Sequence, residues 1–108
     1  MPDTPSPARK AFGDIAPGLA DYTDHILFGD VWERPGLAPR ERCIVTVSSL
    51  ISLYRTNELG FHIRKALATG VTEAEIIEII THLAFYSGWP TASTALTIAR
   101  GVFHEPKG

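Results

Sequence analysis

The chain of 108 residues is long enough for one domain, because a second hydrophobic core would leave both with too little buried surface. A hydrophobic fraction of 44% and a charged fraction of 20% indicate a globular rather than a disordered protein. The formal net charge of −2, without a basic stripe, argues against nucleic acid or an anionic membrane surface as partners.

No apolar run approaches the ~20 residues that a membrane span requires, and the N-terminal segment lacks the apolar stretch of a signal peptide. The single cysteine, Cys43, excludes an internal disulfide. These features predict a cytoplasmic protein. A chain this small exposes apolar surface unless it finds a partner, so we expect a homo-oligomer.

The N-terminal part of the chain is punctuated by proline. Residues 1–7 contain three prolines and predict a flexible arm, so that residues 8–108 form the helical domain. A first helical region is expected from Ala8, with a break near Pro17, and it resumes over residues 19–28.

A Pro–Gly pair predicts a turn at 33–37. Pro39 follows at a first helical position, which proline favours because its missing N–H has no partner there. The next run, 41–54, is too long for a strand and does not alternate strictly, so it predicts a helix. Thr56 or Asn57 is expected to cap the helix that follows.

Gly70 is expected to end that helix. Thr72 and Glu75 have the spacing of a capping box and predict the start of another helix. We expect it to end at 88–90 and the last helix to cover 91–103, with Leu96 among the inward residues. The sequence therefore predicts an all-α bundle of five to six helices joined by short loops.

Four segments, taken in order and spacing, resemble the carboxymuconolactone decarboxylase family, which has an AhpD-like helical fold. They are LFGDVWERPGL at 27–37, RER at 40–42, NELGFHIRKAL with GVT between 57 and 72, and HLAFYSGWPTA at 82–92. The resemblance covers roughly residues 20–104. It implies an AhpD-like bundle and a homo-oligomer, either a trimer or a hexamer.

One branch of that family resembles an alkylhydroperoxidase and carries Cys-x-x-Cys followed by a histidine. Counting back from His62, the two cysteine positions fall on Arg55 and Glu58, which form neither a thiolate nor a disulfide. The glutamate proton shuttle of that branch would lie near Cys43. The sequence therefore excludes thiol redox chemistry, and peroxidase activity with it.

The other branch decarboxylates a small carboxylated lactone, in aromatic compound catabolism. The resemblance implies that no cofactor is needed, because the leaving carboxylate is conjugated with the lactone carbonyl. Loss of CO₂ gives a dienolate that is then protonated on carbon. Such a site needs a cation for the carboxylates, donors for the developing oxyanion and a general acid.

Glu58 and His62 are four residues apart and therefore share one helix face. A glutamate so placed can hold an imidazole protonated for proton delivery near neutral pH, so we predict both residues to be catalytic. The alternative is that the two residues form a surface pair that contributes little to stability. Arg55 is predicted to bind a substrate carboxylate or, alternatively, to pair with Glu58.

Glu78 and His82 repeat this spacing. The Glu-x-x-His and His-Glu-x-x-His patterns of metal sites are absent, so we expect no metal. His82 is predicted either to line the substrate pocket or to be a hydrogen-bonded core histidine.

Aromatic residues near the proline-rich turns complete the predicted pocket. Trp32 and Arg34 are expected to form a lid over the substrate, and Tyr86 and Trp89 to close the opposite side; packing in the core or in an interface is the alternative. Two other functions stay open: a non-redox family member that binds or processes another small molecule, and a purely structural homo-oligomer.

Overall fold

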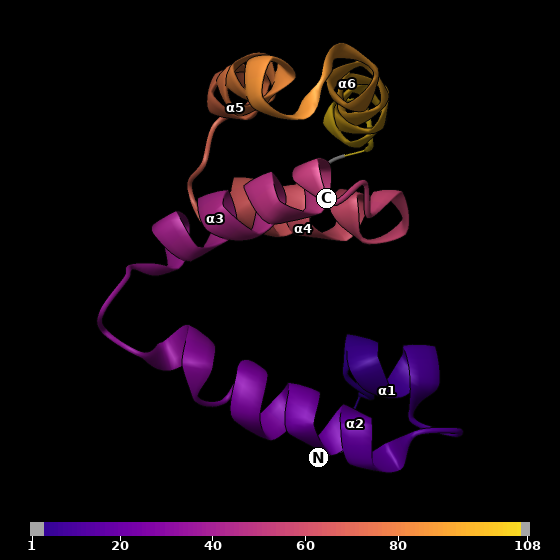
Figure 1. Cartoon of the computed structure of the whole chain (residues 1–108). Helices are drawn as coiled ribbons and strands as arrows, with labels where there is room; N and C mark the ends of the chain where they lie inside the picture. The colour runs from indigo at the N-terminus through magenta and orange to yellow at the C-terminus, as the bar shows by residue number, and fades with distance from the viewer. Residues whose placement is uncertain (1–3, 107–108) are drawn as a thin grey trace. The chain divides into compact units, whose positions relative to one another are not determined.

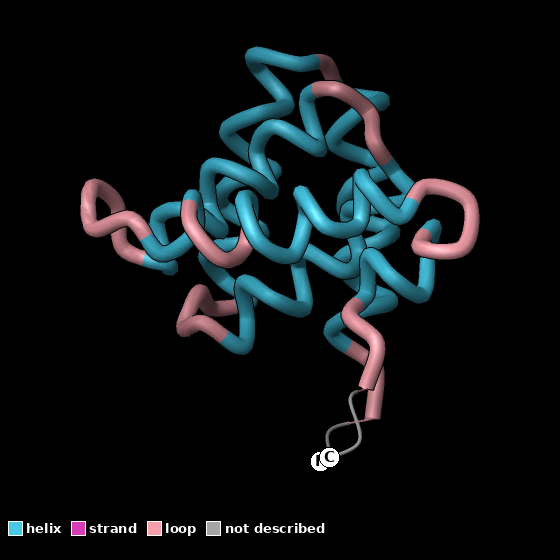
Figure 2. Tube along the Cα trace, turned by 90° about the horizontal axis from the view of Figure 1, so that it is seen from below, coloured by secondary structure: helices cyan, strands magenta, loops and turns pink. Residues whose placement is uncertain are grey.

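The computed structural model describes residues 4–106, and every regular element within them is a helix (Figure 2). This confirms the all-α prediction. The chain divides into two compact units, one ending at Gly36 and the other beginning at Leu37. Within the described residues, no helix has the length and apolar character needed to cross a membrane.

The first unit contains two short α-helices followed by two tighter helical turns. These are α1 (Pro7–Phe12), α2 (Pro17–Tyr22), the π-helical turn η1 (Thr23–Leu27) and the 3₁₀ turn η2 (Val31–Glu33). Pro17 opens α2 at its first position, which explains why the predicted break falls there.

Ser6 links the beginning of α1 to the rest of the first unit. Its hydroxyl accepts a hydrogen bond from the N–H of Arg9 at 3.1 Å and donates one to the Asp24 carboxylate at 2.9 Å. Arg9 also forms ion pairs with Asp21 and Asp24. Residues 1–3 of the predicted arm lie outside the described residues, and the division at 7/8 stays a prediction.

The second unit consists of four longer helices in two layers (Figure 1). One layer contains α3 (Pro39–Ser52) and α4 (Thr56–Ala68), and the other contains α5 (Glu73–Ser87) and α6 (Trp89–Phe103). α3 packs against α5 and α4 packs against α6 across the two layers. This arrangement places one face of every helix in a shared core.

Each of these four helices buries one row of apolar residues at the three-and-four spacing of a helix face. Leu96 was predicted to face inward with the row of α6, but 41% of it is exposed. The buried row of α6 is mostly alanine, so the helix packs closely without the bulkier side chain. The buried rows are Cys43, Val47 and Ile51; Leu59, Ile63 and Ala66; Ile76, Ile80 and Ala84; and Ala92, Ala95, Ala99 and Val102.

The capping box predicted at the start of α5 is confirmed. The Thr72 hydroxyl accepts from the N–H of Glu75 at 3.0 Å, and the Glu75 carboxylate accepts from the N–H of Thr72 at 2.9 Å. Arg40, at the start of α3, donates to the same carboxylate. The Thr72 N–H first, and Arg40 second, hold the pKa of Glu75 below its usual range.

Two predicted helix boundaries are wrong. Neither Thr56 nor Asn57 caps α4; the N-cap is Arg55, and its side chain makes no capping hydrogen bond. The last helix begins at Trp89, two residues before the predicted start, with Pro90 inside its first turn. Proline is tolerated there because the first N–H groups of a helix have no intrahelical partner, and Gly88 alone, at φ 104°, makes the turn.

Because Thr72 satisfies an otherwise unpaired N–H of α5, Thr72→Ala should lower the free energy of unfolding by about 1 kcal/mol. Urea denaturation followed by circular dichroism measures this change. Thr81→Ala is the matched control, since Thr81 lies exposed in the middle of the same helix and bonds only the carbonyl of Ile77. An equal loss in both variants would contradict the capping role.

Candidate functional site

His62 lies on a flank of α4, directly beside the buried row of that helix. A helix turns by about 100° per residue, so Glu58, His62 and Lys65 fall on the same side of the row. The buried row thus fixes the direction in which this flank faces. We call these three residues the α4 flank.

The imidazole of His62 is half-buried and contacts the ring of Phe61 edge to face, with 5.0 Å between ring centroids. Burial lowers the pKa of His62, and the positive charge of Lys65 lowers it further. The carboxylate of Glu58 raises the pKa, as predicted, but has the smallest of the three effects. Glu58 thus favours the imidazolium, as expected, but burial and Lys65 outweigh it, so the pKa of His62 lies below its usual value.

Arg55 precedes the α4 flank and is exposed. Its carbonyl oxygen accepts from the N–H of Glu58 at 3.3 Å, but no ion pair joins the two side chains in the part of the chain that the structure describes. The alternative in which Arg55 simply pairs with Glu58 is thus wrong, and binding of a substrate carboxylate by Arg55 stays a prediction.

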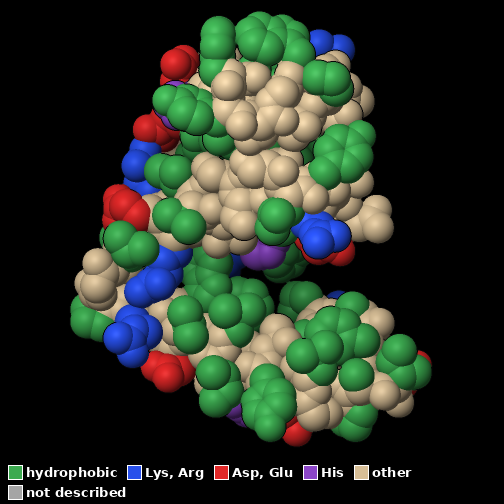
Figure 3. Space-filling view, in the orientation of Figure 1, with side chains coloured by type: hydrophobic (Ala, Val, Ile, Leu, Met, Phe, Trp, Pro, Cys, Tyr) green, Lys and Arg blue, Asp and Glu red, His purple; other side chains and the backbone are tan. Residues whose placement is uncertain are grey.

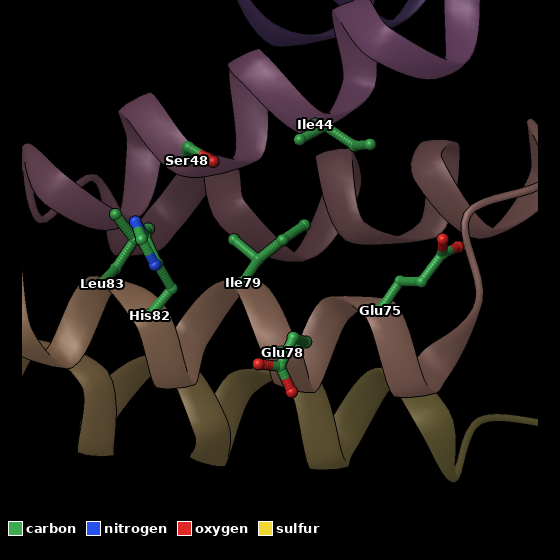
Figure 4. Close-up of a pocket in the computed structure, with 7 residues that line it drawn as sticks. All are labelled: Ile44, Ser48, Glu75, Glu78, Ile79, His82 and Leu83. Carbon is green, nitrogen blue, oxygen red and sulfur yellow. The ribbon is translucent and has the colours of Figure 1, made fainter.

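A second candidate region is an open groove of about 410 Å³ between α3 and α5 (Figure 4). Its apolar floor comes from both helices, and its polar groups come mainly from α5. His62 does not line it. The lining residues are Ile44, Ser48, Glu75, Glu78, Ile79, His82 and Leu83.

His82 lines this groove, and its imidazole reaches from α5 toward α3 (Figure 4). The side chain is exposed and stacks on Tyr86 at 4.8 Å between ring centroids, so it is not a core histidine. The carboxylate of Glu78 is turned away from α3 (Figure 4). The lining includes two carboxylates and no lysine or arginine, which makes the groove unfavourable for an anion.

Trp89 lies at a different place from His82 and Tyr86. It contacts Phe85 edge to face at 4.9 Å, beside an apolar hollow of about 360 Å³ between α5 and α6. Phe85 is 74% exposed and Trp89 62%. Hydrophobic side chains gather over the α5–α6 layer (Figure 3). Tyr86 and Trp89 therefore do not close one common pocket within the chain.

Trp32 and Arg34 belong to the first unit, where the Trp32 ring lies 5.9 Å from that of Phe28. Their role as a lid stays a prediction. Cys43 is 2% exposed in the core row of α3. Among the described residues, no group of three or more His, Cys, Asp and Glu side chains is placed to hold a metal ion.

Lys65, whose charge acts on His62, was not among the predicted site residues. The signal was present, because residues three apart on a helix are neighbours and Lys65 is three residues after His62.

Comparison with known proteins relates the chain to decarboxylases. The sequence profile of the carboxymuconolactone decarboxylase family matches residues 17–101. The chain is 35% identical to a 4-carboxymuconolactone decarboxylase of Acinetobacter baylyi, over 85% of this chain and 69% of that protein. It is 37% identical to a nitrosuccinic acid decarboxylase of Metarhizium robertsii, over 90% of this chain and 67% of that protein.

Glu58→Gln should lower the pKa of His62 further, because it removes the charge that stabilises the imidazolium. A titration of the His62 ring protons by NMR measures the shift, and His62→Gln identifies the signal. Glu78→Gln is the matched control, with the same spacing to His82 but on another helix. If both variants left the His62 titration unchanged, the carboxylate of Glu58 would not act on the imidazole.

Proposed function

Because the chain belongs to the carboxymuconolactone decarboxylase family, we propose that it decarboxylates a small carboxylic acid without a cofactor, with His62 as general acid. Membership confirms the resemblance that the four sequence segments indicated. The observation that carries the proposal is the half-buried imidazole of His62 on the α4 flank, between a carboxylate and an ammonium group.

The two named relatives act on acids of related chemistry. Their names give the substrates as 4-carboxymuconolactone and nitrosuccinic acid. In the first, a C=C bond links the carbon that loses CO₂ to the lactone carbonyl, and in the second a nitro group lies beside a carboxylate. In both acids the electron pair of the breaking C–C bond passes to an acceptor already in the molecule. The common substrate class is therefore an acid whose carbanion is stabilised by its own substituent, which is why no cofactor is required.

The reaction balances with one proton. The C–C bond to the carboxylate breaks, its electron pair moves to the acceptor, and CO₂ leaves. The resulting carbanion equivalent takes a proton on carbon, so one carboxylate and one proton give CO₂ and a new C–H bond. His62 supplies this proton, and Glu58 stabilises the imidazolium form of His62 in which the proton is carried.

Thiol redox chemistry finds no support in the second unit. Cys43 is buried, and the positions that would carry the redox pair hold Arg55 and Glu58. The substrate on which we would test the chain first is 4-carboxymuconolactone, with nitrosuccinate second.

The exposed aromatic face formed by Phe85 and Trp89 supports a second proposal, that the chain forms a homo-oligomer, a trimer or a hexamer, through the α5–α6 layer. A contiguous apolar patch on a small protein generally marks an interaction site. The rim of this hollow adds Leu96, which is 41% exposed although it lies on the helix that packs the core.

His62→Gln should lower the decarboxylation rate by about 10²–10⁴-fold, the usual contribution of a general acid. CO₂ release from 4-carboxymuconolactone and from nitrosuccinate measures it, with folding checked by circular dichroism. His25→Gln, an exposed histidine of the first unit, serves as the control. Nearly full activity in folded His62→Gln would assign the proton to another group, with His82 the next candidate.

Light scattering at micromolar concentration should give the mass of three or six chains. Phe85→Lys should shift the mass toward the monomer, because it places a charge in the centre of the apolar face. Ile15→Lys is the control, an apolar residue of the first unit that is 82% exposed. A monomer mass for the wild-type protein would contradict the proposed homo-oligomer.

A further inference from the structure

We propose that the groove between α3 and α5 binds a small organic amine, in its ammonium form, that carries an apolar chain. His62 does not line this groove, so the site is separate from the proposed general acid. Of the residues predicted for the substrate pocket, His82 alone is in its lining. The inference therefore adds a second ligand, of opposite charge to the acid that the proposed decarboxylation consumes.

The groove has the size and the floor of a small-molecule site. Its volume of about 410 Å³ falls within the usual range of ligand pockets, roughly 300–1,000 Å³. Ile44 from α3, with Ile79 and Leu83 from α5, forms an apolar floor (Figure 4), and all three are half-buried. A short hydrocarbon chain laid on this floor removes apolar surface of both partners from water, which favours binding.

The polar groups beside this floor are hydrogen-bond acceptors. Ser48 of α3 and His82 of α5 lie toward the same end of the groove (Figure 4), and Glu78 precedes His82 by one turn of α5. No hydrogen bond or ion pair joins these three side chains to another residue within the described part of the chain. A primary ammonium has three N–H donors, which suit a carboxylate, a hydroxyl oxygen and the unprotonated nitrogen of a neutral imidazole.

The charges around the groove favour a cation. Glu75, toward the other end, accepts from Arg40, which compensates its charge, whereas the exposed carboxylate of Glu78 keeps its own. α5 contains neither lysine nor arginine. Arg42 lies about 200° around α3 from Ile44, so its side chain leaves the helix on the side away from the groove. The basic residues of α4 and α6 do not line the groove either.

Both parts of the ligand are needed. A metal ion has no apolar part, and the described residues offer no group of three or more His, Cys, Asp and Glu side chains placed to hold one. An aliphatic alcohol would use the floor but not the charge of Glu78, and an aliphatic acid would be repelled. Because solvent screens an exposed carboxylate, the ion pair contributes modestly and the apolar contact supplies the rest of the affinity.

Hexylammonium is the probe, with 1-hexanol and hexanoate as the uncharged and anionic analogues of the same chain. NMR titration follows the methyl signals of Ile44, Ile79 and Leu83 and the ring signals of His82. Hexylammonium up to about 10 mM should shift them together, with a Kd of about 1 mM. Hexanol should bind about fivefold more weakly, the usual limit for one exposed ion pair, and hexanoate more weakly still.

Glu78→Gln should weaken the binding of hexylammonium about fivefold and leave that of hexanol unchanged, because it removes the charge alone. Glu33→Gln is the matched control, since it removes the same charge from an exposed glutamate of the first unit. Ser48→Leu should abolish the binding of both ligands by filling the groove. If circular dichroism shows that this variant does not fold, Ser48→Ala replaces it and should weaken hexylammonium binding about threefold.

Four outcomes would overturn the site. They are an absence of shifts in the groove signals, equal affinities for hexylammonium and hexanol, equal losses in Glu78→Gln and Glu33→Gln, and shifts confined to Phe85 and Trp89, which would place the amine in the hollow between α5 and α6. If dilution shifts the groove signals and the amine does not, a second copy of the chain covers the groove and the proposal is wrong. None of these measurements involves CO₂ release, so they stand or fall independently of the proposed decarboxylation.

Discussion

The burial of Leu59, Ile63 and Ala66 determines where everything else on α4 points. All three are at most 2% exposed, and each large apolar side chain contributes about 1.5–3 kcal/mol when it leaves water. Rotation of the helix about its axis would expose this row, so the flank beside it has a fixed direction. The polar residues of the candidate site are therefore positioned by hydrophobic packing between α3, α4 and α6, and the chemical groups themselves contribute little to holding the helix in place.

The charges of the α4 flank act against one another at His62. Burial and Lys65 favour the neutral imidazole, Glu58 favours the imidazolium, and the first two prevail. In the thiol redox branch of the family, from which the sequence departs, the positions of Arg55 and Glu58 would carry the reactive cysteines. Under the proposed function, the start of α4 carries ionisable groups for proton transfer where the other branch carries thiols for electron transfer.

Local rules were sufficient for most of the fold. The capping box of Thr72 and Glu75 and the buried apolar rows follow from residues within one or two helical turns of each other, which a single sequence displays. The start of α6 at Trp89 was not predicted because Gly-Trp-Pro was expected only to end the preceding helix. Proline also fits the first turn of a helix, where Pro90 lies. The ion pair of Arg40 with Glu75 spans 35 residues, a separation over which sequence spacing carries no information. The sequence also did not reveal that the pKa of His62 is lowered, because the main cause is burial, and burial depends on how α4 packs against the other helices.

The difference in electrostatics between the two candidate regions decides which one suits an acid. An anion in the groove between α3 and α5 would approach Glu75 and Glu78, and Arg40, which is bonded to Glu75, does not line the groove. Like charges repel, so these two carboxylates make the groove unfavourable for an anion, although solvent screens the effect. On the α4 flank the ammonium of Lys65 offsets the carboxylate of Glu58, so a carboxylate meets no such penalty. Of the two histidines, His62 therefore has the surroundings that better fit the proposed decarboxylation of an acid.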